Sequence, residues 1–263
     1  MPNPDFEAGA PPDTPIALGA LSDAMKTFGI GRDAEASWRD LKPTLLRLIK
    51  DFNAHRLLEI GGGRFPYLSA TEVEQLGCEL TVNDILEDEL ARAPAEFHKA
   101  CFDISAPLPA SLAREEYDFV FSRMVFEHVR DGRQAWSNCL QLLRPGGVAF
   151  AFVPTLWSPP FVVNRLTPER LSARVLRMID ADRTQEGTPK FPAYYQLCRG
   201  DDATIAPVLR DIGFSEVAVV PFYGTPYLPV IPVVKHIARA FDRVIDAFNI
   251  KAFTSYAYIV ARK

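Results

Sequence analysis

Leu57-Leu58-Glu59-Ile60-Gly61-Gly62-Gly63-Arg64-Phe65-Pro66 decides the fold, because an apolar run ends here in an acid and three glycines. The run predicts a buried strand over residues 56–60. Glycine lets the backbone turn sharply and approach a ligand where any Cβ would collide. A helix that follows such a turn offers free N–H groups to the same ligand. A nucleotide-like ligand at this crevice is one interpretation, and a simple tight connection is the other.

Short apolar runs alternate with helical patterns outward from this turn, which is typical of βα units and a parallel sheet covered on both faces. We expect strands at residues 56–60, 79–83, about 97–102, 117–122, 147–153, 216–222 and 255–261. Helices are expected near residues 36–52, 69–76, 87–93, 132–143 and 201–213. The last two strands can pair as a hairpin-like unit. The prediction is an α/β fold with a seven-stranded, mostly parallel, doubly wound (Rossmann-like) sheet and a helical cap.

Prolines mark the regions outside the predicted sheet. The chain has 22 prolines, which cluster in the first fifteen residues and again between Pro154 and Pro232. We expect a flexible arm at 1–15 and a single domain at 16–263, with acceptor-binding cap insertions at about 154–200 and 223–253. Residues 233–248 form an amphipathic helical pattern. In the simplest interpretation that helix packs on the sheet or on the N-terminal helix, while a lid, a dimer contact and a membrane-surface helix are alternatives.

Composition excludes several classes of function. The 263 residues are 48% apolar, enough for one large domain, and 29 Lys+Arg against 33 Asp+Glu leave a net charge of −4. Without a basic surplus, no nucleic-acid partner is expected. The four cysteines form no C-x-x-C pair, which predicts reduced, buried thiols rather than a zinc site or disulfides. The first residues lack the charged and apolar regions of a secretory signal, so none is expected, and prolines and glycines break the longest uncharged stretch. We therefore expect a cytoplasmic protein without stable membrane insertion.

Two further acids follow predicted strands directly. Asp84 comes after the second strand, where a carboxylate can accept both hydroxyls of a ribose. Asp103 comes after the third, from where it can accept a bond from an exocyclic amine. Each acid taken alone is equally well explained as a turn or cap residue. Together with Glu59 and the glycine turn, they favour a nucleotide-like ligand at the strand ends.

The run Tyr117-Asp-Phe-Val-Phe-Ser-Arg-Met-Val-Phe-Glu-His-Val129, followed by Leu142-Leu-Arg-Pro-Gly-Gly147, resembles the class I S-adenosylmethionine-dependent methyltransferases. More narrowly, it is similar to their type 11-like, small-molecule branch, which includes the ubiquinone-type and sugar-modifying enzymes. The resemblance covers about Leu57 to Pro154. The family often has a third pattern glycine where this chain has Phe65, so the shape of the glycine loop stays open.

The resemblance implies S-adenosyl-L-methionine as the cofactor and distributes its parts along the strand ends. Glu59 and the glycines would contact or shape the methionine pocket, and Asp84 would hold the ribose. Ile85 would lie against the adenine, with Asp103 and the residue after it at the adenine edge. Ser122 and Arg123 would line the floor of the pocket after the fourth strand. The implied cofactor-binding residues are Glu59, Gly61, Gly62, Gly63, Asp84, Ile85, Asp103, Ile104, Ser122 and Arg123.

The candidate residues for binding and activating the methyl acceptor lie in segments that follow the fourth and fifth strands. Methyl transfer from a sulfonium mainly requires alignment and exclusion of water, and a general base helps a hydroxyl acceptor. His128 is the candidate base, because imidazole titrates near neutral pH; local packing is the alternative. Trp157, Tyr194 and Tyr195 are candidate acceptor contacts, with packing under a loop as the alternative. No metal is implied.

We therefore expect a transferase that methylates an oxygen, nitrogen or carbon atom of a small organic acceptor, such as a sugar, a lipid-linked intermediate, a quinone or a secondary metabolite. A catalytically silent methyltransferase-like cofactor-binding or scaffold protein is the alternative. An NAD(P)-dependent oxidoreductase is disfavoured, because Pro66 occupies the sixth position of its G-x-G-x-x-G fingerprint. The protein is expected to be a monomer or a homodimer.

Overall fold

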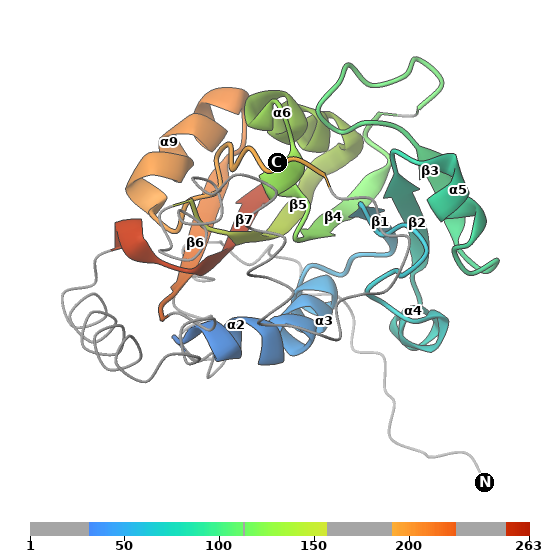
Figure 1. Ribbon diagram of the computed structural model, residues 1–263. Helices are drawn as coiled ribbons and strands as arrows, with labels where there is room; N and C mark the ends of the chain where they lie inside the picture. The colour runs from blue at the N-terminus through green and yellow to red at the C-terminus, as the bar shows by residue number, and fades with distance from the viewer. Residues whose placement is uncertain (1–31, 113, 157–190, 225–250) are drawn as a thin grey trace, which may run out of the picture.

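The computed structural model describes residues 32–112, 114–156, 191–224 and 251–263, and these form one seven-stranded sheet with helices on both faces (Figure 1). The strand order is β3-β2-β1-β4-β5-β7-β6. The first five strands of that order are parallel, and β7 is antiparallel to both neighbours. The predicted fold class is confirmed. The strands are β1 (Arg56–Ile60), β2 (Glu79–Asp84), β3 (His98–Cys101), β4 (Tyr117–Arg123), β5 (Leu143–Pro154), β6 (Glu216–Phe222) and β7 (Tyr256–Arg262).

The helices form a layer on each side of the sheet. Figure 1 shows α2, α3 and α4 on one side and α6 and α9 on the other. None of the helices in the described ranges is long and apolar enough to span a membrane. The helices are α2 (Ala34–Arg39), α3 (Leu41–Asp51), α4 (Ala70–Leu76), α5 (Glu87–Ala91), α6 (Gly132–Leu142) and α9 (Asp202–Ile212), with short 3₁₀ helices η1 (Phe126–His128) and η3 (Lys251–Phe253).

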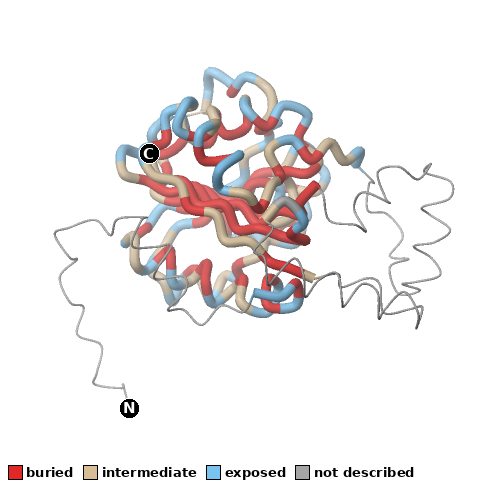
Figure 2. Tube along the Cα trace, turned by 90° about the vertical axis from the view of Figure 1, so that its left-hand side faces the viewer, coloured by how far each residue is buried: buried red, intermediate tan, exposed pale blue. Residues whose placement is uncertain are grey.

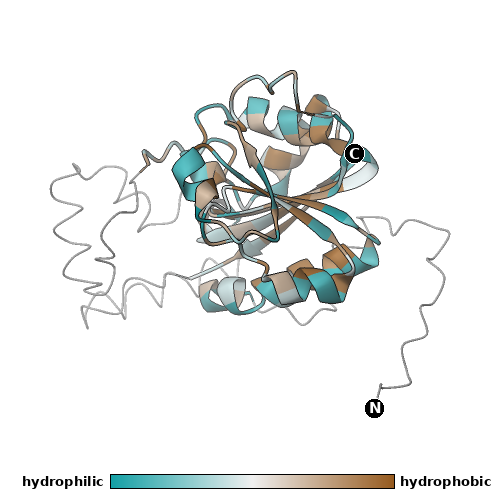
Figure 3. Ribbon diagram, turned by 90° about the vertical axis from the view of Figure 1, so that its right-hand side faces the viewer, coloured by the Kyte–Doolittle hydropathy of each residue, from teal (hydrophilic) through white to brown (hydrophobic). Residues whose placement is uncertain are grey.

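Strand side chains alternate between two apolar cores because successive residues point to opposite faces. In β4, Phe119 and Phe121 pack toward α3, while Val120 packs toward α6. Figure 2 shows the buried strands between the two helical layers, and Figure 3 shows that the outer helix faces are hydrophilic. Both faces of the sheet are therefore covered, so its carboxyl-terminal edge is the place for a ligand.

The helix expected over 36–52 is two helices, α2 and α3, which meet at Asp40. Pro43 lies in the first turn of α3. It has no N–H to donate to the carbonyl of Arg39, and its ring would clash with that carbonyl in an unbroken helix. The carbonyl of Asp40 starts α3 instead, accepting from the N–H of Thr44 at 3.0 Å. The sequence carried this signal, since the proline stands in the middle of the expected helix.

The fifth strand begins at Leu143, four residues before the expected start at Gly147. Its register with β4 shifts between Tyr117, opposite Leu143, and Phe119, opposite Val148. A Cβ on Gly147 would lie 3.0 Å from the carbonyl oxygen of Asp118. The glycines expected to form a turn before the strand thus form an irregularity within it.

Further expectations concern the ends of α9, the cysteines and the proline-rich segments. Asp201 caps α9 by accepting from the N–H of Ala203 at 3.0 Å, and Gly213 ends the helix, as predicted. All four cysteines are free, but Cys101 is exposed because β3 is an edge strand, so the expectation of buried thiols was wrong there. The arm at 1–15, the helix at 233–248 and most of the two cap insertions lie outside the described residues.

Candidate functional site

The glycine loop after β1 passes tightly against the neighbouring strand ends. Gly61 and Gly63 have φ angles of +71° and +49°, a region that L side chains rarely adopt. A Cβ on Gly61 would lie 2.6 Å from Val125 Cγ2, and one on Gly63 would lie 2.8 Å from Asp84 Oδ2. Gly62 leaves no more room, since its Cβ would meet a Val82 methyl at 2.9 Å. The glycines therefore shape a cradle that any side chain would fill.

The side chain of Glu59 is bonded to the backbone of the segment that follows the glycines and is not exposed to solvent. Its side chain is buried, and both carboxylate oxygens accept from the N–H of Tyr67, at 3.0 and 2.9 Å. Burial raises the pKa of Glu59 to about 7, although the Tyr67 bond and the charges of Arg123 and Lys42 oppose the rise. Glu59 thus shapes the loop, which is one of the two roles that the sequence implied.

Asp84, at the end of β2, faces the glycine loop. Its Oδ1 accepts from the N–H of Leu86 at 3.0 Å, while Oδ2 lies beside Gly63. Burial raises the pKa of this half-buried carboxyl, and the bonds from backbone N–H groups lower it. Ile85, the next residue, is 48% exposed. An acid able to accept hydroxyls and an apolar surface therefore lie side by side at the cradle.

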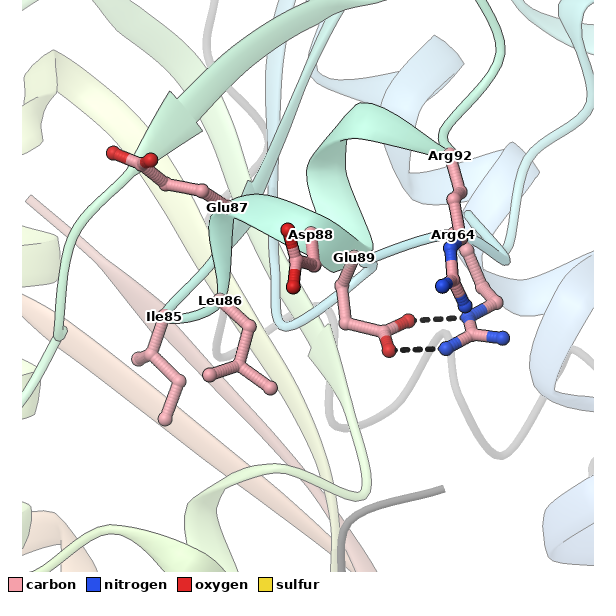
Figure 4. A pocket seen from close by; sticks show the side chains of 7 residues that line it. All are labelled: Arg64, Ile85, Leu86, Glu87, Asp88, Glu89 and Arg92. Carbon is pink, nitrogen blue, oxygen red and sulfur yellow. Dashed lines mark hydrogen bonds and ion pairs between the residues drawn. The ribbon is translucent and has the colours of Figure 1, made fainter. Parts of the chain in front are cut away.

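A cavity of about 520 Å³ opens next to Ile85, within the range of small-molecule sites (Figure 4). Arg64, from the glycine loop, forms a two-bond ion pair with Glu89 of α5. The pair ties the loop to α5 and closes one side of the cavity. The lining residues are Arg64, Ile85, Leu86, Glu87, Asp88, Glu89 and Arg92.

Asp103 and Ile104, expected together at the adenine edge, have different environments. Asp103 is exposed, and its Oδ1 accepts from the N–H and the hydroxyl of Ser105 at 2.8 and 2.7 Å. Ile104 is 4% exposed and packs in the core on the α6 side, so its side chain does not face the edge. Its carbonyl accepts from Asn138 Nδ2 at 2.7 Å. Only Asp103 of the two presents its side chain to solvent.

Two buried amides that the sequence analysis missed hold this region. Asn83 donates to the carbonyls of Ala100 and Phe102, both at 2.9 Å, and so ties the end of β2 to the end of β3. Asn138 fixes the following loop from α6. The position of Asn83 directly before Asp84 was the available signal, whereas nothing near Asn138 in sequence marks its partners.

The end of β4 brings one buried and one half-buried polar side chain to the same edge. Ser122 is buried, and its Oγ has no hydrogen-bond partner within the described part of the chain. The guanidinium carbon of Arg123 lies 4.6 Å from the centre of the Tyr67 ring. Both residues were expected to line the floor after the fourth strand, but they are its last two residues, because β4 runs to Arg123.

Glu127 joins the end of β4 to a distant segment of the chain. Its carbonyl accepts from the N–H groups of Tyr194 and Tyr195, at 2.6 and 3.0 Å. Its side chain is buried, burial raises its pKa to about 8, and Oε2 has no partner among the described residues. A buried acid without a cation at bonding distance binds its proton more tightly than an exposed one. The residues around Glu127 in the sequence give no signal of this role.

His128 extends from the same short helix toward solvent. Its Nδ1 lies 3.0 Å from the carbonyl oxygen of Pro192. A carbonyl only accepts, so the ring donates from Nδ1 and carries its lone pair on Nε2 when neutral. Nε2 lies 3.8 Å from Glu127 Oε1. This tautomer is the one that a base acting through Nε2 needs.

The candidate acceptor residues are only partly placed. Tyr194 is half-buried beside Glu127, whereas Tyr195 is 4% exposed and packs in the core, which fits the packing alternative. Trp157 lies outside the described residues. Within the described ranges, no group of three or more His, Cys, Asp or Glu side chains has the arrangement of a metal site.

Known proteins share this fold. Residues 58–151 match the family model described as a methyltransferase domain. A SAM-dependent methyltransferase from Archaeoglobus fulgidus is similar, with 21% identity, a TM-score of 0.52, and coverage of 86% of this chain and 94% of that chain. An S-adenosylmethionine-dependent methyltransferase from Mesorhizobium loti is also similar, with 16% identity and a TM-score of 0.52. The alignment covers 84% of this chain and 96% of that chain. No curated protein matches the chain.

A further similar structure is Haemonchus contortus phosphoethanolamine N-methyltransferase 2 in complex with S-adenosyl-L-methionine, with 18% identity and a TM-score of 0.50. The alignment covers 83% of this chain but 51% of that enzyme, so the chain spans about half of its length. The resemblance that the sequence showed is confirmed by these matches.

Proposed function

We propose that this chain, which carries a class I methyltransferase domain over residues 58–151, methylates an oxygen, nitrogen or carbon atom of a small organic acceptor. S-adenosylmethionine is the cofactor of this domain. The observation that carries the proposal is the cradle at Gly61–Gly63, where a Cβ would meet Val125 or Asp84. Its glycines let the loop pack directly against the neighbouring strand ends, so that the loop backbone, an acid and an exposed apolar side chain lie together there.

The residues present fit the parts of the cofactor. Asp84 Oδ2 accepts ribose hydroxyls, and Ile85 offers an apolar surface to the adenine. Asp103 accepts from the exocyclic amine with the oxygen not used by Ser105. The buried hydroxyl of Ser122, unpartnered in the described chain, is available to a polar group of the methionine part. When bound, the cofactor supplies a methyl group on a positively charged sulfur.

His128 supplies the proton chemistry for a hydroxyl acceptor. The bond from Nδ1 to the carbonyl of Pro192 orients the ring and leaves the lone pair on Nε2, which lies 3.8 Å from Glu127 Oε1, to take a proton. Pro192 and Tyr194 belong to one segment that Glu127 holds through its backbone carbonyl. The segment that positions the base is therefore also the segment that brings Tyr194 toward an acceptor. Trp157 and the two cap insertions complete the acceptor site in this proposal.

Calorimetry with S-adenosylhomocysteine tests the proposal. The wild-type chain should bind it. D84A should weaken binding by about 10-fold or more, whereas H128A should leave binding within about twofold, because of these two residues only Asp84 is proposed to contact the cofactor. Labelled methyl groups from S-adenosylmethionine should then appear in a small-molecule fraction of a cell extract. Absence of binding would refute the proposal, whereas binding without any labelled product would favour the silent cofactor-binding protein.

A further inference from the structure

Arg123 is a cation at the end of β4, and no carboxylate among the described residues lies at bonding distance from it. It is half-buried, and its guanidinium makes no ion pair or hydrogen bond with the described residues. Other arginines at strand and loop ends are paired with carboxylates, namely Arg56 with Glu116, Arg64 with Glu89 and Arg144 with Asp118. A half-buried charge without a partner is costly, so it indicates a ligand that supplies the counter-charge.

Glu59, the nearby buried carboxylate, does not serve as this partner. Both of its oxygens are bonded to the N–H of Tyr67. Arg123 acts on Glu59 only through its charge, which lowers the pKa of the carboxyl, while burial raises it to about 7. Glu59 therefore makes no direct bond to the guanidinium, and the N–H donors of Arg123 are not used by this carboxyl.

Tyr67 holds the guanidinium in place. Its backbone is anchored to Glu59 at the end of the glycine loop, and its ring lies 4.6 Å from the guanidinium carbon of Arg123. Lys42 Nζ lies 4.9 Å from the same ring but is paired with Glu72 at 3.0 Å. Of the two cations on this ring, only Arg123 is available. An arginine stacked on an aromatic ring presents its N–H donors in a fixed plane.

The sheet order places Arg123 across the glycine loop from the nucleoside residues. Strands β2 and β4 flank β1. Asp84 ends β2 and Arg123 ends β4, so they lie on opposite sides of the loop that follows β1. A ligand whose ribose lies at Asp84 therefore extends its other end toward Arg123. In the proposed cofactor that end is an amino acid with a carboxylate.

We propose that Arg123, held on the Tyr67 ring, binds the carboxylate of the methionine part of the cofactor. The inference rests on the proposed function and deepens it. Two parallel N–H donors of a guanidinium match the two oxygens of a carboxylate, which gives direction as well as charge. Asp84 and Arg123 would then hold opposite ends of the cofactor, the ribose and the carboxylate.

The experiment compares two ligands that differ at this carboxylate. S-adenosylhomocysteine has the amino acid end, and 5′-methylthioadenosine keeps the adenosine and the thioether sulfur without it. In R123M, which preserves an apolar contact with Tyr67, affinity for S-adenosylhomocysteine should fall about 10- to 100-fold. Affinity for 5′-methylthioadenosine should stay within about twofold of wild type, which also shows that the variant is folded.

Two further variants serve as references. R133M removes an exposed arginine that pairs with Asp211, far from the glycine loop, and should bind both ligands as the wild type does. R123K keeps a point charge without the planar pair of donors, so its preference for S-adenosylhomocysteine should lie between wild type and R123M. Raising the salt concentration should reduce the preference in the wild type more than in R123M.

Equal loss of both ligands in R123M and R123K would overturn the inference, since Arg123 would then only shape the crevice. Unchanged affinity for S-adenosylhomocysteine in both variants would overturn it too, because the carboxylate would bind elsewhere. If the wild type binds neither ligand, the proposed function itself fails, and the inference fails with it. Failure of the inference alone is recognised by a wild type that binds both ligands.

Discussion

The two halves of the candidate site are held together in different ways. The glycine loop after β1 is fixed by nearby strands and by a carboxylate eight residues earlier in the chain, since Glu59 bonds to Tyr67. The loop after β4 is fixed by a segment more than sixty residues later, through the bonds of Glu127 to Tyr194 and of His128 to Pro192. Cofactor binding thus depends on local structure, while positioning of the candidate base depends on a long-range return of the chain.

This difference separates what each half can tolerate. A change in the loop after β4 beyond Val125, which packs against Gly61, can alter the rate of transfer and leave the cofactor pocket intact. A change in the glycine loop acts on the pocket directly, because its atoms are in contact with Asp84 and Val125. Four substitutions, ordered by expected effect, test the separation.

The largest effect is expected at His128. In H128N the side-chain amide can still donate to Pro192, but Nε2 is lost. For a hydroxyl acceptor, kcat should fall about 10²- to 10⁴-fold while affinity for S-adenosylhomocysteine stays within about twofold. Rates of labelled methyl transfer and calorimetry measure the two quantities. H98N, at an exposed position of β3, is the control, and equal rates in both variants would make His128 a packing residue.

The glycine loop should respond in the opposite way. In G63A the new Cβ would lie 2.8 Å from Asp84 Oδ2 at a φ of +49°, so affinity for S-adenosylhomocysteine should fall about 100-fold. G77A is the matched control, because Gly77 has a φ of +65° with nothing within 4 Å of a Cβ. It should cost about 1 kcal/mol of stability and no affinity. Similar affinities in the two variants would show that a Cβ at Gly63 is tolerated and that this glycine does not shape the cofactor pocket.

The same distinction explains how much of the molecule the sequence predicted. The strands β1 and β6 have the expected bounds, and the glycine turn and Asp84 lie at the expected strand ends. These signals are local, since each residue lies beside the apolar run that places it. Ile85, which the resemblance placed against the adenine, directly follows Asp84 and is exposed.

Features that depend on distant partners were not predictable. Nothing around Glu127 shows that Tyr194 and Tyr195 bond to its carbonyl. The burial of Ile104 likewise depends on packing on the α6 side, and local order at the strand end suggested an open side chain. The available cation at Arg123 follows from contacts with Tyr67 that only the folded chain reveals.

Glu127 offers a pH test of the long-range half. Its folded-state pKa of about 8 lies above the ordinary value of 4.5, so the folded chain binds this proton more tightly than the unfolded chain. Its contribution to stability is full below about pH 4.5 and is lost as the pH rises through about 8, at about 1 kcal/mol per pH unit. Glu59 has the same sign but stops contributing to the slope above about pH 7.

Urea unfolding between pH 7 and 8 therefore isolates Glu127. The wild type should lose stability over this interval, and E127Q, which carries no titrating proton, should lose much less. E74Q, at an exposed position of α4, should follow the wild type. If the free energies of unfolding of the wild type and E127Q changed with pH in the same way, the raised pKa of Glu127 would be contradicted.

The smallest effect is expected at Asp103, where a turn role and a ligand role make different predictions. Its Oδ1 accepts two bonds from Ser105, so in D103N those bonds keep the oxygen in place and turn the new NH₂ group toward the position of Oδ2. If Oδ2 accepts from the exocyclic amine, two donors then face each other, and affinity for S-adenosylhomocysteine should fall about 3- to 10-fold. S105A loosens the turn but keeps the carboxylate, so it should reduce stability by about 1 kcal/mol without affecting affinity. An unchanged affinity in D103N would leave Asp103 as a turn residue, and recognition of the adenine would rest on the apolar surface of Ile85.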